Sequence, residues 1–362
     1  MAAGDAIELR DLWVAGDGGY HTYRIPALVT TPRGTLVAIC EGRRRSHHDV
    51  GLIDLLARRS TDGGRTWSEP RLVAAAPGQT TGNPAPVVDR QTGVIWLPFC
   101  RNPAFDADGR RDKWRYDRPV WLTHSADDGR TWADPVEITA AVKAPEWTWY
   151  STGPGHGIQL AGGRLLIACT HRVRGPGRAD DRDDARYSHV VCSDDHGATW
   201  HPGGSVSREG TNECAAVELA GGAVYLTCRD QAGGGRRYAA LSRDGGDTFP
   251  EVWRDEALLE PACEASLVGL PDGDGNGEGT VTVFCNPASR TRDTLTVRLS
   301  RDGCRTWPTA RLLEPGRAAY SDLAVLPDRT LVCLFERGRH SPYERLTLAR
   351  FDLAWLTGGA FR

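Results

Sequence analysis

The chain has 362 residues, of which 40% are hydrophobic, and its formal net charge at pH 7 is −3. This length is large for an ordinary compact domain but suits an array of repeats that closes on itself. A net charge near zero argues against binding of nucleic acid through bulk positive charge, so we expect no nucleic-acid partner.

The first ten residues, MAAGDAIELR, lack the basic segment and apolar segment that together mark a secretory signal peptide. No stretch of the sequence is apolar for long enough to cross a membrane as a helix. We therefore expect a soluble protein without a membrane partner. It would be cytoplasmic as the sequence stands, and secreted if a signal peptide was removed.

Short apolar runs bounded by glycine or polar residues recur along the chain, and each reads as a β-strand. The clearest are GTLVAIC (34–40), VVDRQTGVIWLPFC (87–100), GGRLLIAC (162–169), GGAVYLTC (221–228) and RTLVCLF (329–335). No stretch longer than a turn or two has the period of a helix. Many short strands with turn signals and no alternating helices predict an all-β propeller.

The ten cysteines mostly end or interrupt these runs, as Cys40 and Cys285 do, and no CxxC pair is present. Zinc sites and redox motifs commonly use such pairs. We therefore expect the cysteines to be small buried side chains within strands. A disulfide framework and a zinc site are both disfavoured.

An eight-residue pattern occurs five times. The copies are STDGGRTW (60–67), SADDGRTW (125–132), SDDHGATW (193–200), SRDGGDTF (242–249) and SRDGCRTW (300–307). Aspartate at the third position can accept backbone N–H groups across a tight turn, and glycine at the fifth permits positive φ. Since these aspartates recur equivalently in each repeat, we expect them to be structural. Cys304 replaces the glycine of the last copy, so we expect that turn to be altered.

The pattern S-x-D-x-G-x-T-W is the Asp-box, and the chain resembles the sialidase (neuraminidase) family of bacterial and animal exo-sialidases. The resemblance runs from YRIPAL (23–28) to FDLAWL (351–356). It implies a single catalytic domain over residues 1–362, folded as a six-bladed β-propeller. Because non-catalytic propellers also carry Asp-boxes, the remaining motifs decide the function.

The resemblance implies that three arginines converge on the carboxylate of a sialic acid. They are Arg24 in YRIPA, Arg229 in VYLTCRDQ and Arg292 in SRTRDT, with Arg290 as the alternative to Arg292. A guanidinium group suits this task because its planar fork binds a carboxylate with two hydrogen bonds and stays charged.

Asp49, in RRRSHHDVGL, matches the position of the family's general acid and base. It would protonate the glycosidic oxygen and then deprotonate water. Asp54, in the apolar stretch that follows, is the competing choice. The polar run around Asp49 reads as a loop.

Tyr320 in AAYSDL and Glu213 in TNECAAVEL match the family's nucleophile and its base. A carboxylate nucleophile would approach a carbon that already bears a carboxylate, and like charges at short range repel. A neutral phenol avoids this repulsion, and sialidases with a tyrosine nucleophile are a known exception to the two-carboxylate mechanism. Because an ordinary tyrosine has a pKa of about 10, it needs a base such as Glu213.

Further residues are expected to support the site. Glu336 in LVCLFERG matches the acid that orients Arg24 in the family, and Glu41 is its rival as the partner of Arg24 or Arg43. The other expected pocket residues are Arg43, Asn83 and His156.

We expect no metal and no cofactor. The segment DGDGNGEG (272–279) begins like a calcium loop, but Val283 stands where the bidentate glutamate belongs. We interpret this segment as a hairpin tip.

Together the motifs predict a retaining exo-glycosidase that removes terminal α-linked sialic acids from glycoconjugates through a tyrosyl-glycosyl intermediate. One alternative is a carbohydrate-binding Asp-box propeller without activity. Another is a hydrolase specific for a related acid sugar such as Kdn or Kdo, because the arginine clamp would be unchanged.

Overall fold

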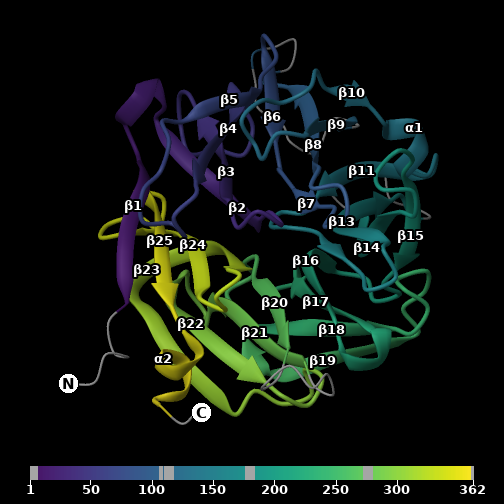
Figure 1. The fold of residues 1–362 in the computed structure, drawn as a ribbon. Coiled ribbons are helices and arrows are strands. Elements are labelled where there is room, and N and C mark those ends of the chain that lie inside the picture. The colour runs from purple at the N-terminus through teal and green to yellow at the C-terminus, as the bar shows by residue number, and fades with distance from the viewer. Residues whose placement is uncertain (1–6, 106–108, 110–117, 176–183, 272–279, 360–362) are drawn as a thin grey trace.

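The computed structural model describes residues 7–105, 109, 118–175, 184–271 and 280–359. Within them the fold is all-β, with mainly antiparallel sheets arranged around a common centre (Figure 1). In this part of the chain helical structure is confined to short turns: η1 Asp17–Gly19, α1 Thr139–Val142, η3 Ala220–Gly222 and α2 Leu353–Thr357. The all-β prediction is therefore confirmed, and the segment 272–279 lies outside the described residues.

The strands of the described residues form four hydrogen-bonded sheets. The first contains β2 Thr22–Thr30, β3 Leu36–Arg43, β4 Ile53–Ser60, β5 Arg71–Ala74, β6 Gln79–Gly82, β7 Val87–Val88, β8 Ile95–Pro103, β9 Val120–Ser125 and β10 Val136–Glu137. The second contains β11 Trp147–Thr152, β12 Ile158–Gln159, β13 Leu165–Val173, β14 Ala185–Ser193 and β15 His201–Ser205. The third contains β16 Thr211–Glu218, β17 Val224–Asp230, β18 Arg236–Ser242 and β19 Glu251–Leu259. The fourth contains β20 Ser266–Pro271, β21 Thr280–Pro287, β22 Asp293–Ser300, β23 Thr309–Val325, β24 Leu331–Gly338, β25 Arg345–Phe351 and β1 Glu8–Val14.

The two ends of the described chain meet in one sheet. Strand β1 pairs antiparallel with β25, with Glu8 opposite Arg350 and Val14 opposite Arg345. In Figure 1 the purple β1 accordingly lies beside the yellow β25. This pairing covers an edge that each strand would otherwise expose, and unpaired strand edges invite aggregation.

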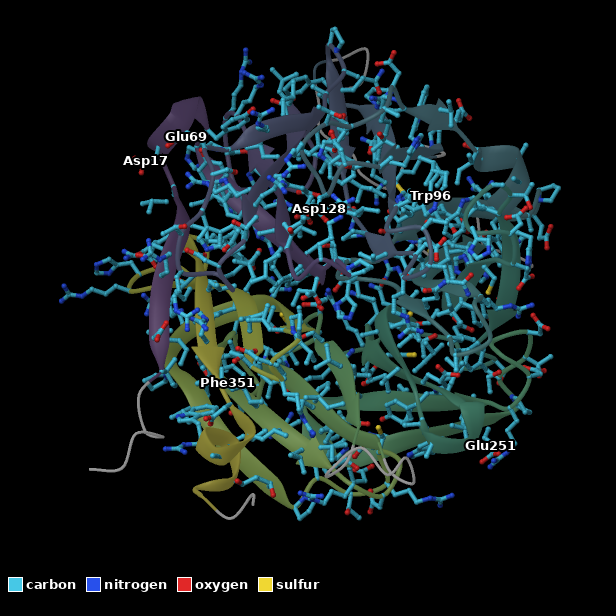
Figure 2. The ribbon with its side chains drawn as sticks, in the orientation of Figure 1. Asp17, Glu69, Trp96, Asp128, Glu251 and Phe351 are labelled. Atoms are coloured by element: carbon cyan, nitrogen blue, oxygen red, sulfur yellow. The ribbon has the colours of Figure 1, made fainter. Side chains whose placement is uncertain are left out.

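Apolar side chains from adjacent sheets pack against one another, and a further apolar cluster lies among the strands of the first sheet; Figure 2 draws the side chains on the ribbon. Every residue of β3 is buried, so this strand contributes to packing on both of its faces. A continuous apolar run such as LVAIC is typical of a strand that is covered on both sides. All ten cysteines are buried and none forms a disulfide, which confirms the expectation from the sequence.

Each Asp-box forms the same tight turn. In the first copy, Asp62 accepts hydrogen bonds from the backbone N–H of Thr66 at 2.9 Å and from its hydroxyl at 2.7 Å. Asp127, Asp195, Asp244 and Asp302 make the same pair of bonds to a threonine four residues later. The structural role predicted for these aspartates fits this geometry.

The expectation for Cys304 is wrong, because the fifth turn is not altered. The N–H of Cys304 donates to the Ser300 hydroxyl at 3.1 Å, as the N–H of Gly64 donates to Ser60 at 2.8 Å in the first copy. Cys304 adopts φ +64°, a left-handed conformation in which glycine is favoured. Its side chain is buried in an apolar cluster that also contains Trp307 and Phe284, and this burial offsets the backbone strain.

Candidate active site

A polar cavity of about 380 Å³ is lined by residues from distant parts of the chain. It contains all the predicted catalytic and clamp residues and two of the three further residues expected in the pocket: Arg24, Arg43, Asp49, Asn83, Glu213, Arg229, Arg292 and Tyr320. Glu336, predicted as a supporting residue, is fully buried behind Arg24.

Three of these residues sit where the strand pairing is irregular. The register shifts between Arg24 and Ala27 in β2, between Thr211 and Cys214 in β16, and between Ala318 and Ser321 in β23. Such irregularities re-aim side chains that regular pleating would direct elsewhere. They occur at Arg24, at Glu213 and at Tyr320.

Tyr320 and Glu213 are in direct contact. The Tyr320 hydroxyl donates to Glu213 Oε1 at 2.5 Å, although the two residues are 107 positions apart. Arg229 Nη1 donates to Glu213 Oε2 at 2.6 Å and to the Tyr320 oxygen at 3.2 Å. The phenol is therefore held between a carboxylate that can take its proton and a cation that can stabilise the resulting phenolate.

The surroundings move the pKa values of these two groups in opposite directions. Burial alone would raise the pKa of Glu213, but Arg229, the Tyr320 hydrogen bond and Arg292 together hold it below its usual range. Burial and the Glu213 charge raise the pKa of Tyr320 well above 10, against the opposing effect of Arg229 and Arg292. At neutral pH the pair is thus an ionised carboxylate beside a neutral phenol.

The three predicted clamp arginines meet around Tyr320. The guanidinium carbons of Arg24 and Arg292 lie 5.1 and 5.3 Å from the centre of its ring. Arg229 binds its hydroxyl group. Arg292 Nη1 also donates to the hydroxyl of Tyr343 at 2.8 Å. The cavity therefore presents three guanidinium groups on one wall, an arrangement that suits a bound carboxylate.

The structure separates the alternatives that the sequence left open for the clamp. Arg292 lines the cavity, whereas Arg290 is exposed and lies near Gly235. Glu336 binds Arg24 through Nε at 3.0 Å and Nη2 at 3.2 Å, so it is the partner of Arg24. Glu41 instead binds Arg43, at 2.8 and 2.6 Å.

Asp49 lies at the mouth of the cavity, with its side chain 45% exposed. Its Oδ1 accepts from Arg24 Nη1 at 3.3 Å and from Arg43 Nη1 at 3.0 Å. Its rival Asp54 does not line this cavity and instead accepts from the Tyr20 hydroxyl at 2.8 Å and pairs with Arg44 at 2.6 Å. The geometry therefore favours Asp49 as the group that reaches a ligand.

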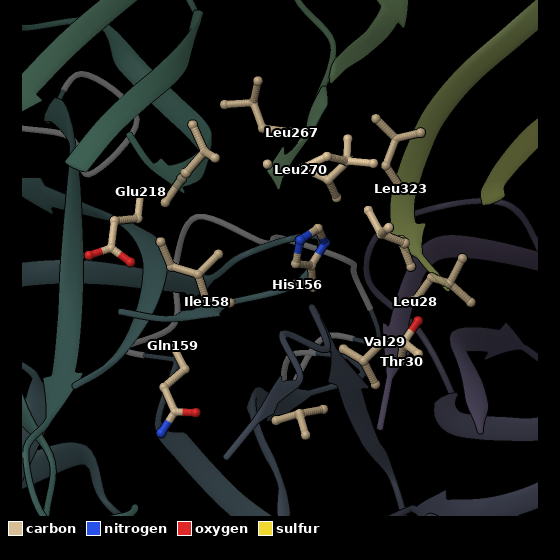
Figure 3. A pocket seen from close by; sticks show the side chains of 18 of the residues that line it. Leu28, Val29, Thr30, His156, Ile158, Gln159, Glu218, Leu267, Leu270 and Leu323 are labelled. Atoms are coloured by element: carbon tan, nitrogen blue, oxygen red, sulfur yellow. The ribbon is translucent and has the colours of Figure 1, made fainter. Parts of the chain in front are cut away.

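The expectation for His156 is wrong. This histidine lies in a second cavity of about 530 Å³, lined largely by apolar side chains such as Leu28, Ile158 and Leu323 (Figure 3). Its Nδ1 is 2.7 Å from Asp322 Oδ1. Asp322 comes two residues after Tyr320 on β23. The motif that contains His156 therefore contributes to the apolar cavity and not to the polar cavity.

Sequence motifs did not reveal several residues of the polar cavity. Tyr343 packs against the guanidinium group of Arg24, with the ring centre 4.0 Å away. Arg118 donates to Asn83 Oδ1 at 2.8 Å and lies over the ring of Trp149. Tyr343, Arg118 and Trp149 belong to no repeated pattern. Tyr343 could have been suspected only because it follows closely on the strand that carries Glu336.

Within the described residues, no group of three or more histidine, cysteine, aspartate or glutamate side chains is placed to hold a metal ion. No helix in the described part of the chain is long and apolar enough to cross a membrane.

Comparison with known proteins gives consistent results. The family model described as BNR repeat-like domain matches residues 34–333. A sialidase of Micromonospora viridifaciens is 37% identical over 96% of this chain and 54% of its own length. Sialidase-3 of Mus musculus is 31% identical over 91% of both chains. The chain thus spans about half the length of the bacterial relative but nearly all of the mouse protein.

Solved structures agree with these matches. A Hadza microbial sialidase superposes with a TM-score of 0.84 at 32% identity, covering 94% of this chain and 68% of that one. The intramolecular trans-sialidase from Ruminococcus gnavus has a TM-score of 0.75 at 18% identity, over 96% and 98% of the two chains, and its likeness concerns the fold alone. With its family match, its relatives and its Asp-box turns, the chain belongs to the sialidase family of BNR-repeat proteins.

Proposed function

We propose that the protein is a retaining exo-glycosidase that hydrolyses terminal α-linked sialic acids. The observation that carries the proposal is the contact between Tyr320 and Glu213 beneath three arginines. A phenol, a base and a cationic wall together suit a sugar whose anomeric carbon bears a carboxylate. Asp-boxes alone would not support this choice, because they serve as turns.

In the first step the sugar carboxylate binds Arg24, Arg229 and Arg292. The Tyr320 oxygen attacks C2 while its proton passes to Glu213, and the glycosidic bond breaks. The leaving oxygen takes a proton from Asp49, which stands at the mouth where a leaving group can depart. Since Arg24 contacts Asp49 at 3.3 Å, the substrate carboxylate competes for this arginine and releases Asp49 toward the leaving group.

In the second step Asp49 removes a proton from water, and the resulting hydroxide attacks C2. The bond between C2 and the Tyr320 oxygen breaks, and Glu213 returns its proton to the phenolate. Two successive displacements at one carbon give net retention of configuration. Arg229, which binds both partners, stabilises the charge that develops on the tyrosine oxygen.

We further propose that the whole chain forms one six-bladed propeller domain. The apolar cavity is lined by six described strands: β2, β7, β12, β16, β20 and β23. Strand β23 supports this count because it pairs with β22 through residues 309–317 and with β24 through 317–325, so it joins two blades into one sheet. The parallel pairing between β4 and β6 joins two further blades into the first sheet. Sialidase neighbours are themselves propellers.

The proposed partner is a sialylated glycoconjugate or one that carries a related acid sugar. The clamp recognises a carboxylate and leaves the choice between N-acetylneuraminic acid, Kdn and Kdo to the rest of the cavity lining, which includes Asn83, Arg118 and Trp149. A carbohydrate-binding propeller without activity remains the alternative of another class. A protein that only binds carbohydrate would need no base beside Tyr320, so the contact between Glu213 and Tyr320 favours the enzyme.

Turnover of aryl glycosides of the three acid sugars tests the proposal. The parent enzyme should cleave at least one of them, and Tyr320→Phe should lose nearly all of that activity while still binding the product sugar. Cleavage of none by the parent would favour the binding protein. Cleavage of Kdn or Kdo alone would narrow the substrate class.

A further inference from the structure

We propose that the buried pair Arg237–Glu260 positions two of the clamp arginines, Arg229 and Arg292. This inference rests on the proposed function, because it takes the clamp to be the carboxylate site. Neither residue of the pair lines the active-site cavity. Arg237 and Glu260 instead bind backbone groups of the segments that carry or contact the clamp arginines.

The pair is closed off from solvent. Arg237 Nη1 lies 2.6 Å from Glu260 Oε2, and both side chains are 0% exposed. Arg237 also donates to the Thr227 hydroxyl at 2.8 Å and to the Thr227 carbonyl at 3.3 Å. Loss of one partner would leave the other as an uncompensated buried charge, which is strongly unfavourable. The positions of Arg237 and Glu260 are therefore tightly fixed.

One arm of the pair reaches Arg229. Glu260 Oε1 accepts the backbone N–H of Asp230 at 2.6 Å, and Asp230 directly follows Arg229 at the end of β17. The Thr227 carbonyl and hydroxyl bound by Arg237 lie two residues before Arg229 on the same strand. The peptide segment that carries Arg229 is thus held on both sides by the same ion pair.

The other arm reaches Arg292. The segment from Glu260 to Cys263 leads from β19 to β20, and the Cys263 carbonyl accepts from Arg237 Nη1 at 2.8 Å. One residue earlier, the Ala262 carbonyl accepts from Arg292 Nη2 at 3.4 Å, and Ala262 adopts φ +51°. A left-handed alanine persists only where its surroundings hold it. The pair anchors both ends of this short segment.

This segment also supports the nucleophile. Cys263 is buried in one apolar cluster with Ile25, Ala319 and Tyr320. Its carbonyl is held by Arg237. A shift of the segment would therefore move both Arg292 and the apolar cluster that packs against Tyr320. Small displacements of binding groups cause large losses of catalytic rate.

The test uses Glu260→Gln, which keeps the size of the side chain and an acceptor for the Asp230 N–H but removes the charge. The probe is the 2,3-didehydro-2-deoxy analogue of the acid sugar that the parent cleaves, and its Kd is measured by calorimetry well below the unfolding temperature of each variant. We expect the Kd to rise by about 10- to 100-fold. The value of kcat/KM should fall in proportion for good and poor leaving groups alike.

Asp128→Asn is the matched control. Asp128 is a buried acid that accepts from Thr35 at 2.5 Å and pairs with Arg59 at 3.6 Å, and it does not line the active-site cavity. This variant should lower the unfolding temperature and leave the probe Kd unchanged. If Glu260 had a purely structural role, Glu260→Gln would likewise lower the unfolding temperature and leave the Kd of the probe unchanged.

Thr227→Val provides a milder second variant if Glu260→Gln does not fold, because it removes only one bond to Arg237. Thr227→Val should also raise the Kd of the probe. A Kd within about threefold of the parent for the folded variants would overturn the inference and leave the proposed function intact. A parent that neither cleaves nor binds any of the acid sugars would overturn both.

Discussion

At the scale of single residues, neighbouring groups set the charge of each residue in the active-site cavity. Glu213 stays ionised because Arg229 and Arg292 oppose the effect of its burial. Tyr320 stays protonated because burial and the Glu213 charge disfavour the phenolate. Proton transfer from Tyr320 is therefore unfavourable at rest. It becomes useful only when a bond to the sugar forms and the negative charge on the oxygen disappears.

The first prediction concerns Asp49. Asp49→Asn should lower kcat/KM for a natural glycoside by about 10²- to 10⁴-fold, the usual contribution of a general acid. A nitrophenyl glycoside should lose much less in its first step, because its leaving group needs little protonation. Steady-state and burst kinetics on both substrates provide the measurement. Equal losses in the first step on both would exclude Asp49 as the acid.

At the scale of elements, the Asp-box turn couples neighbouring sheets through its glycine. In the third copy, Gly197 has φ +90°, and a Cβ placed there would lie 2.1 Å from the ring of Trp96. The Trp96 indole N–H donates to the adjacent His196 carbonyl at 2.9 Å. The turn therefore serves as a docking point for a tryptophan of the preceding repeat, in addition to reversing the chain.

The second prediction follows from this contact. Gly197→Ala should destabilise the protein by about 2–4 kcal/mol, because left-handed strain and overpacking add. Gly78→Ala is the control, since Gly78 has φ +69° but nothing lies within 4 Å of the position that an added methyl group would occupy. It should cost only about 1 kcal/mol. Urea unfolding of both variants measures the difference, and equal losses would show that the Trp96 contact adds nothing.

The elements also show how far a sequence leads. YRIPA, TNECA and AAYSDL pointed to Arg24, Glu213 and Tyr320 because these strings resemble motifs of the sialidase family, and the residue types suit the chemistry. The strings did not reveal that each sits at an irregularity in the pairing, which is a property of two strands together. His156 was misplaced because its motif indicates a strand and a turn but not which of the two cavities the side chain lines.

Contacts between remote residues were the least predictable. Tyr343 and Arg118 enter the cavity through loops without a motif. Arg237 and Glu260 read as ordinary charged residues beside strands until their complete burial is seen. Cys304 looked like a broken turn because a single substituted position was judged without the apolar cluster that receives its side chain.

At the scale of the whole molecule, buried ionisable groups make folding depend on pH. His171 and His189 touch through their Nδ1 atoms at 3.1 Å, and both are enclosed with Trp147 and Tyr150. Burial lowers the pKa of His171 to about 3, and burial and His171 lower that of His189. In the unfolded chain these two histidines would bind protons near pH 6.5, whereas in the folded chain they stay neutral at this pH.

The third prediction takes its sign from this difference. Stability contributed by the neutral histidines is complete above pH 6.5 and is lost as the pH falls toward their folded pKa values. His171 alone should contribute a loss of about 2 kcal/mol between pH 6.5 and pH 5. His171→Asn should therefore flatten the pH dependence of urea unfolding over this range.

His340→Asn is the matched control, because His340 is exposed and should leave the pH dependence as in the parent. An unchanged slope for His171→Asn would mean that the folded protein protonates His171 as readily as the unfolded chain does, contrary to the enclosed position of His171.

The most direct test of the central claim is to trap the covalent intermediate. A 2,3-difluoro derivative of the preferred acid sugar should inactivate the enzyme with a stoichiometry of one, and peptide mass spectrometry should find the added glycosyl mass on Tyr320. Tyr320→Phe should acquire no label. A label on Glu213 or Asp49, or a parent enzyme that turns over substrate but never forms an adduct, would contradict the account.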